Sequence, residues 1–273
     1  MGRPRLQPID DAPAADLRSG TQSIERAVTV LRVIASRGRL GMRIAEVVST
    51  AGLAYSTCFR MLQCLQQQGL IDKDSHTRKF YLGPLVHELG LLARPRFRLS
   101  ELCDREMQLL AESTQDTVYL SERSGLEAVC TARQVGEYPI KALPLDVGIR
   151  RPLGVGAGGL AILGAMDPDE AESVVRINGP RYEAFGGLTA RRMLQAVAET
   201  RSRGFSFLDS VATPGSAALG VAFPVNHPIA AISVAAISGR MPASRHKALA
   251  SAMSKHVARL SVLMQEMHSI VPG

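Results

Sequence analysis

The sequence of 273 residues predicts an α+β protein, in which a small helical domain with a hairpin precedes a larger domain of mixed helices and strands. Between residues 21 and 83, segments with helical periodicity are followed by two short strand-like segments. From residue 99 onward, helical and strand-like segments alternate, and the last of them is a long helix. Apolar residues make up 46% of the chain and charged residues 21%, so the chain can bury a core.

The positive charge is concentrated in the first third of the chain. Residues 1–98 contain 15 Lys and Arg against 8 Asp and Glu, whereas the remaining residues contain 17 of each kind. The whole formal charge of +7 therefore lies in the smaller domain and its flanks, which indicates a polyanionic partner for that region.

Several classes of protein are disfavoured. No apolar run reaches the roughly 18–20 residues of a membrane span, and the first residues lack the apolar segment of a secretory signal. We therefore expect a cytoplasmic protein without a membrane partner. The four cysteines show no C-x-x-C spacing and the six histidines no H-E-x-x-H, so neither a metal site nor a cofactor is expected.

The smaller domain begins after a polar segment. Residues 1–20 are rich in Pro, Asp and Ala without periodicity and are predicted to be a disordered tail. The first helix begins at Ser23, the second is centred on Val47, and the third begins near Ala54 and ends at Gly69.

A hairpin follows the third helix. Residues 70–73 and 79–82 are strand-like, and the polar loop 74–78 joins them. Helix, helix, short turn, helix and hairpin is the order of a winged helix-turn-helix, which we predict over residues 21–83. An amphipathic linker helix is predicted over residues 84–98.

The outward face of the third helix is polar and contains no acidic residue, as a phosphate-lined groove requires. Ser56 and Thr57 lie in its first turn, where hydroxyl and backbone N–H groups can bind a phosphate. Gln63 suits adenine, and Arg60 suits guanine or a phosphate. The residues predicted to contact duplex DNA are Arg43, Tyr55, Ser56, Thr57, Arg60, Gln63, Lys73, Arg78 and Lys79.

The larger domain is predicted over residues 99–273. Its helices are expected at 99–114, 168–177, 189–203 and 242–267, and its strands at 117–123, 127–133, 205–207, 220–225 and 229–237. Strands flanked by helices at both ends indicate an antiparallel sheet that is covered on one or both faces.

A glycine-rich segment at 154–159 matches the pattern G-x-G-x-x-G. A dinucleotide site would add a full helix and an acidic residue about 20 positions later, but the helix at 160–166 is short and runs into Asp167-Pro168. Two interpretations remain. The segment either presents the N-terminus of a helix to an anion or forms a tight turn that allows close helix packing.

One further pattern is typical of enzymes. Ser244-Arg245-His246-Lys247 matches S-x-x-K, but the partner motifs Ser-Asp-Asn and Lys-Thr-Gly are missing. Ser244 is placed to cap the last helix, and the chain contains no G-x-S-x-G. We therefore expect no catalytic residue and no enzymatic activity.

Short motifs at 23–27, 52–53, 56–65, 69–71 and 81–85 form a specific set. Together they resemble the IclR family of bacterial transcription regulators, and the similarity covers the chain from about residue 21. The resemblance implies a winged helix, a connecting helix and a GAF-like α/β effector-binding domain. It also implies dimers or tetramers on palindromic or repeated operator sites, with repression as the commoner outcome.

The resemblance further implies a ligand pocket in the larger domain. Residues 152–161 are similar to the family's segment over the effector pocket, so backbone N–H groups near Ala157 and Gly158 would hold a carboxylate. Small apolar residues stand where relatives often supply a polar group, which favours an effector with one carboxylate and an apolar or aromatic body. The implied pocket residues are Ile140, Leu143, Leu153, Ala157, Gly158, Asp209, Ala218, Gly220, Ser233 and Ala235.

The sequence thus predicts a transcription regulator, by resemblance a repressor, that binds a double-stranded operator as a homodimer or homotetramer and responds to a small carboxylate metabolite. In the alternative, the larger domain only oligomerises, and the thin polar lining of the implied pocket keeps this open. An enzyme that binds a nucleotide at the glycine-rich segment is disfavoured.

Overall fold

The computed structural model describes residues 21–270 except 94–98, 144, 212 and 225–228. The predicted tail at 1–20 lies outside the described residues, as does the second part of the predicted linker helix. The chain divides into two compact units, Met1–Ala93 and Arg94–Gly273.

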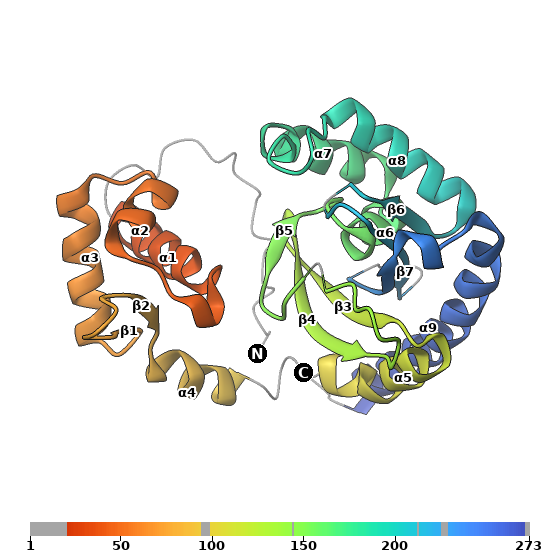
Figure 1. Ribbon diagram of the computed structural model, residues 1–273, viewed down its shortest axis with the longest axis horizontal. Helices are drawn as coiled ribbons and strands as arrows, with labels where there is room; N and C mark the ends of the chain where they lie inside the picture. Colours follow the sequence, from red (N-terminus) through yellow and green to blue (C-terminus); the bar gives the residue numbers. More distant parts are fainter. Residues whose placement is uncertain (1–20, 94–98, 144, 212, 225–228, 271–273) are drawn as a thin grey trace, which may run out of the picture. The chain divides into compact units, whose positions relative to one another are not determined.

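The first unit has the element order that the sequence predicts for a winged helix-turn-helix. Its elements are α1 (Gln22–Ala35), a 3-10 turn (Gly38–Leu40), α2 (Ile44–Ala51), α3 (Tyr55–Gln67), β1 (Ile71–Lys73), β2 (Phe80–Leu82) and α4 (Pro84–Ala93), as Figure 1 shows. The strands β1 and β2 pair antiparallel, with Ile71 opposite Leu82.

The core of this unit forms where apolar residues recur at helical spacing. In α3, Cys58, Leu62 and Leu65 are buried, as the sequence predicts, and they pack with Val30 of α1 and Phe80 of β2. Burying one face of each helix supplies most of the stability that such short helices need. The opposite face of α3 is thereby left in solvent.

The second unit is built on one antiparallel sheet with strand order β5-β4-β3-β8-β7-β6. Its strands are β3 (Thr117–Ser124), β4 (Glu127–Val135), β5 (Arg150–Pro152), β6 (Ser206–Asp209), β7 (Ser216–Phe223) and β8 (Ala230–Ile237). Its helices are α5 (Leu99–Thr114), α6 (Ala157–Ala165), α7 (Pro168–Tyr182), α8 (Ala190–Arg203) and α9 (Ala243–Ile270). A second 3-10 turn spans Ser238–Arg240.

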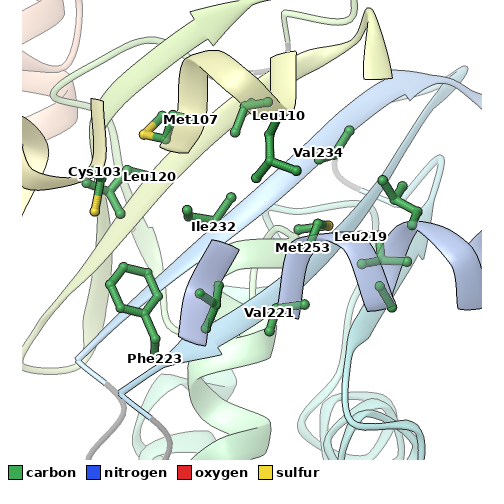
Figure 2. Packing of buried hydrophobic residues seen from close by; sticks show 14 of the residues in the cluster. Cys103, Met107, Leu110, Leu120, Leu219, Val221, Phe223, Ile232, Val234 and Met253 are labelled. Carbon is green, nitrogen blue, oxygen red and sulfur yellow. The ribbon is translucent and has the colours of Figure 1, made fainter. Parts of the chain in front are cut away.

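Helices cover both faces of this sheet. This confirms the α+β prediction, and of its two alternatives it is the sheet covered on both faces that the structure shows. On one face, α5 and α9 pack on the sheet through the cluster that Figure 2 shows, which contains Met107, Leu120, Leu219, Ile232 and Met253. On the other face, a second buried cluster joins α6, α7 and α8 to the sheet. The central strands β3 and β8 are therefore buried on both sides over most of their length.

The central strand β3 shows how the two faces are separated. Val118 and Leu120 point into the cluster under α5 and α9, whereas Tyr119 and Ser121 face the α6 side, because successive side chains alternate. The pairing with β4 shifts register between Leu120 and Ser121, which marks a bulge. Bulges change the direction of nearby side chains.

Some elements differ from the sequence predictions. The helix expected at 168–177 continues to Tyr182, and the strand expected at 220–225 begins earlier, at Ser216. The short strand β5 was not predicted, because Arg150-Arg151-Pro152 has no alternation of apolar and polar residues.

No helix of the described residues is long and apolar enough to cross a membrane. Over the same part of the chain, no group of three or more His, Cys, Asp or Glu side chains is arranged to hold a metal ion.

Candidate functional site

Helix α3 begins without a side-chain cap. Gly52 ends α2 in the left-handed conformation (φ 64°) and donates its N–H to Val48, which turns the chain sharply toward α3. The residue before α3 is Ala54, whose methyl group cannot accept the free N–H groups of the first turn. Ser56 is exposed in that turn and Thr57 is half-buried. A phosphate can therefore bind there.

The exposed side of α3 carries the polar residues that the sequence selects. Arg60 and Gln63 are exposed, one turn apart. Tyr55 and Phe59 are also exposed, and their rings stack with centroids 6.3 Å apart and an angle of 7° between their planes. Phe59 was not predicted as a contact residue, because an aromatic residue in a helix is more often part of the core.

The loop between β1 and β2, which we call the wing, is held by Asp74. One oxygen of Asp74 accepts the N–H of Thr77 (2.6 Å), its hydroxyl (2.9 Å) and the N–H of His76 (3.0 Å). These bonds, first those from Thr77, lower the pKa of the Asp74 carboxyl. Arg78 follows with a positive φ of 57° and is exposed, and Lys79 Nζ donates to the Leu40 carbonyl (2.8 Å).

A basic groove lies between the start of α3 and the wing. It is lined by Arg43, Tyr55, Phe59, Lys73 and Arg78 together with Ile44, Ala45, His76, Thr77 and Phe80. A second hollow is lined by Ser23, Arg26, Thr57, Arg60, Met61 and Cys64. No acidic side chain stands among these described lining residues. Both surfaces therefore suit a polyanion.

The second unit contains a small cavity between the sheet and the start of α6. Its volume is about 60 Å³, and its lining comes from α6, from all six strands of the sheet and from loop residues that include Leu145, Val211 and Thr213. One end is polar and the other is apolar, and the two ends are best described separately.

The polar end of the cavity is the N-terminus of α6. Gly156 precedes the helix with φ 90°, and no side chain caps the free N–H groups of the first turn. A Cβ at Gly158 would lie 2.5 Å from Ser121 Oγ and 3.7 Å from Ser233 Oγ, so both hydroxyls lie against this turn. Ser121 and Ser233 are 5% and 6% exposed, and neither hydroxyl has a hydrogen-bond partner among the described residues.

The glycine-rich segment therefore fits both interpretations at once. Gly158 permits the close approach of α6 to β3, which is the packing role. The same approach places two buried hydroxyl groups beside free backbone N–H groups, which is the geometry of an anion site. Hydroxyl groups that line a cavity can donate hydrogen bonds to a ligand bound there.

The apolar end is lined by Tyr119, Cys130, Leu145, Ala218 and Ala235. Tyr119 donates its hydroxyl to the Ala142 carbonyl (3.2 Å). Burial raises the pKa of Tyr119 to about 12 and that of the Cys130 thiol to about 11. Both groups are therefore neutral at physiological pH.

One charged side chain lines the cavity among the residues that the structure describes. It is Arg151 of β5, beside the polar end. Burial lowers the pKa of its guanidinium, although an arginine stays protonated at physiological pH. The cavity therefore carries a positive charge close to the positive end of the α6 dipole.

Comparison with known proteins identifies the family. Residues 23–75 match the model of the IclR helix-turn-helix domain, and residues 95–262 match that of the bacterial transcriptional regulator IclR C-terminal domain. The chain belongs to the IclR family.

Curated relatives of this IclR-family chain are regulators. It is 26% identical to the HTH-type transcriptional regulator BhcR of Paracoccus denitrificans over 95% of this chain and 92% of that one. It is 25% identical to the transcriptional repressor IclR of Escherichia coli over 89% of each chain. The protein is therefore a transcription regulator with a helix-turn-helix DNA-binding domain.

Solved structures show the same fold. An IclR regulator from Alicyclobacillus acidocaldarius matches with a TM-score of 0.72 at 19% identity, over 89% of this chain and 99% of that one. An IclR homologue from Microbacterium hydrocarbonoxydans, complexed with 4-hydroxybenzoate, matches with a TM-score of 0.68 at 18% identity, over 88% and 98%. The predicted IclR fold is thereby confirmed.

The structure brings together part of the effector residues that the resemblance implies. Ala157, Gly158, Ala218, Ser233 and Ala235 line the cavity. The other implied residues are outside its lining.

The contacts or the exposure of each of these five residues explain why it does not line the cavity. Leu153 is fully buried against α6, and its carbonyl accepts the Tyr182 hydroxyl (2.9 Å). Asp209 is exposed and accepts the Ser238 hydroxyl (2.5 Å). Gly220 faces the start of α6, where a Cβ would lie 2.6 Å from the Ala157 carbonyl oxygen. The last two implied residues are exposed on a loop: Ile140 and Leu143.

Sequence reasoning missed several lining residues with polar groups, among them Tyr119, Ser121 and Arg151. The alternation along β3 could have placed Tyr119 and Ser121 on one face. No comparable signal exists for Arg151, because the strand that carries it is only three residues long.

Proposed function

We propose that this IclR-family regulator binds a palindromic or repeated operator through α3 and the wing and acts as a repressor. We further propose that a small organic acid in the second unit controls this binding. Arg43, Lys73, Arg78 and Lys79 would neutralise phosphates, and Arg60 and Gln63 would contact base edges. The linings of the basic groove and of the hollow beside Arg60 contain no acidic side chain, which supports this assignment.

The effector half of the proposal rests on one observation: the hydroxyls of two buried residues, Ser121 and Ser233, line the cavity against the free N–H groups of α6. A carboxylate accepts hydrogen bonds from both kinds of donor and carries the charge that a helix N-terminus favours. The Microbacterium homologue with 4-hydroxybenzoate, itself an acid, supports the same class of ligand. We also propose that the chain acts as a homodimer or homotetramer in the cytoplasm, without a cofactor.

Binding to promoter DNA tests the first half. Fluorescence anisotropy with labelled fragments from the genes beside its own should show saturable binding at about 50 mM salt and a steep loss of affinity at higher salt. If none of these fragments is bound at low ionic strength, the operator assignment is wrong.

A ligand panel tests the second half. Small carboxylic acids should raise the unfolding temperature and change the operator affinity, and their amides should do neither. If no acid in the panel changes operator affinity, the alternative in which the second unit only oligomerises is favoured instead.

A further inference from the structure

We propose that Arg151 is the residue that selects the charge of the effector. In this assignment one carboxylate lies between the Arg151 guanidinium and the first turn of α6. The inference rests on the proposed effector site and adds a residue and a ligand class to it.

The strand β5 directs Arg151 into the cavity and Arg150 away from it. Arg151 pairs with Ala128, which also lines the cavity, and directly paired residues share a face of the sheet. The Arg150 side chain instead binds Glu127 (2.6 Å) and Ser124 (2.9 Å). Two adjacent arginines of the same edge strand thus have different environments.

Arg151 lies beside the polar end of the cavity. Its Nη1 atom is 3.9 Å from the position of a Cβ at Gly156, the residue immediately before α6. The guanidinium and the free N–H groups of α6 are therefore next to each other. A carboxylate at this point can accept a fork of two hydrogen bonds from the guanidinium and further bonds from the helix and from Ser121.

The charges around this point favour an anionic ligand over a cationic one. No Asp or Glu stands among the described residues that line the cavity, and Tyr119 and Cys130 remain neutral. A partly buried guanidinium near a helix N-terminus adds one positive potential to another. An anionic ligand is attracted by both, whereas a neutral ligand of the same shape is not.

The lining also limits the number of charges on the ligand. Arg151 is the sole cation of the lining in the part of the chain that the structure describes, so a second carboxylate would have no ionic partner. Opposite the polar end stand Tyr119, Leu145, Ala218 and Ala235, which suit an apolar or aromatic body. The geometry points to a monocarboxylate with an apolar body.

The test uses the full-length protein with Arg151→Met, Arg151→Lys and the matched control Arg150→Met. Isothermal titration calorimetry would measure Kd for acetate, hexanoate and benzoate, with benzamide and succinate as comparisons. We expect the wild type to bind at least one of the three monocarboxylates and to bind it more tightly than benzamide or succinate. Arg151→Met should weaken that binding by about tenfold or more.

The two control variants make the result specific. Arg150→Met removes the same charge from the same strand but should keep the monocarboxylate affinity, even where it lowers the unfolding temperature. Arg151→Lys should recover part of the affinity, because lysine supplies the charge without the planar fork. Circular dichroism and operator binding would show that the Arg151 variants fold.

Several results would overturn the inference. Monocarboxylate binding that Arg151→Met retains in full would overturn it alone and leave the proposed effector site standing. A loss of monocarboxylate affinity in Arg150→Met as large as that in Arg151→Met would also overturn the inference alone. So would a wild-type affinity for benzamide equal to that for the monocarboxylates. If the wild type binds none of the three monocarboxylates, the inference and the effector half of the proposed function both fall.

Discussion

Arg78 at the tip of the wing offers a test in which stability and DNA binding should move in opposite directions. Its φ of 57° lies in the left-handed region, and its N–H is fixed by a 2.9 Å hydrogen bond to the Asp74 carbonyl. This conformation costs an L-residue other than Gly about 1–2 kcal/mol. Glycine removes that strain but loses about 0.5–1 kcal/mol through the entropy of the unfolded chain. We therefore expect Arg78→Gly to raise the stability of the first unit by about 0.5–1 kcal/mol.

The same substitution should weaken DNA binding. If Arg78 neutralises one phosphate, its loss lowers the slope of log K against log salt by about 0.9 for each chain bound. At 0.1 M salt, this slope corresponds to an affinity about eightfold lower. Anisotropy measurements on one operator fragment at several salt concentrations would give the slope, and scanning calorimetry would give the stability.

Gln115 supplies a matched control, because it has a similar φ of 62° but lies in the second unit. Gln115→Gly should stabilise its own unit and leave the salt slope unchanged. An unchanged slope in Arg78→Gly would show that Arg78 does not contact a phosphate. If Arg78→Gly instead lowers the stability of the first unit, the arginine side chain stabilises the wing by more than the backbone strain costs.

Three other substitutions test separate parts of the structure. Gly158→Ala places a Cβ 2.5 Å from Ser121 Oγ and 2.8 Å from its Cβ, so it should abolish ligand-induced thermal shifts while operator affinity is retained. Phe59 is exposed beside the basic groove and suits a thymine methyl group; replacing operator thymines by deoxyuridine should weaken the wild type but not Phe59→Ala. For Glu127, burial acts to raise the pKa, but hydrogen bonds from Arg150 and Arg181 lower it overall. Its contribution is therefore present above pH about 4.3 and is lost as pH falls, so urea midpoints should depend less on pH in Glu127→Gln.

The helical part of the fold could be predicted because its signals are local. The buried face of α3, with Cys58, Leu62 and Leu65, follows from a period of 3.6 residues, and Gly52 and Gly69 mark the flanking turns. The sheet order could not be derived in the same way. The strand β3 pairs with β8, where Tyr119 stands opposite Ser233. Alternation within each strand carries no information about such a distant partner.

The cavity shows where residue type misleads. Leu153 is apolar and was expected to contact the ligand, but it is fully buried against α6, Tyr182 and their neighbours. Arg151 is charged and would be assigned to the surface from sequence alone. Its direction follows only from its pairing with Ala128 at a sheet edge. Which face a three-residue strand turns inward is a tertiary property, and composition does not encode it.

One ionic contact between the proposed effector and Arg151 is strong enough to account for control of operator binding. A ligand shifts a conformational equilibrium only by the difference between its affinities for the two states. A hydrogen bond to a charged group contributes about 1.5–3 kcal/mol, which lies within the usual range of coupling between two sites, about 1–3 kcal/mol. If the Arg151 contact is made in one state only, it supplies the whole coupling. Loss of Arg151 would then remove the response to the effector, and α3 and the wing, which belong to the other unit, would still bind the operator.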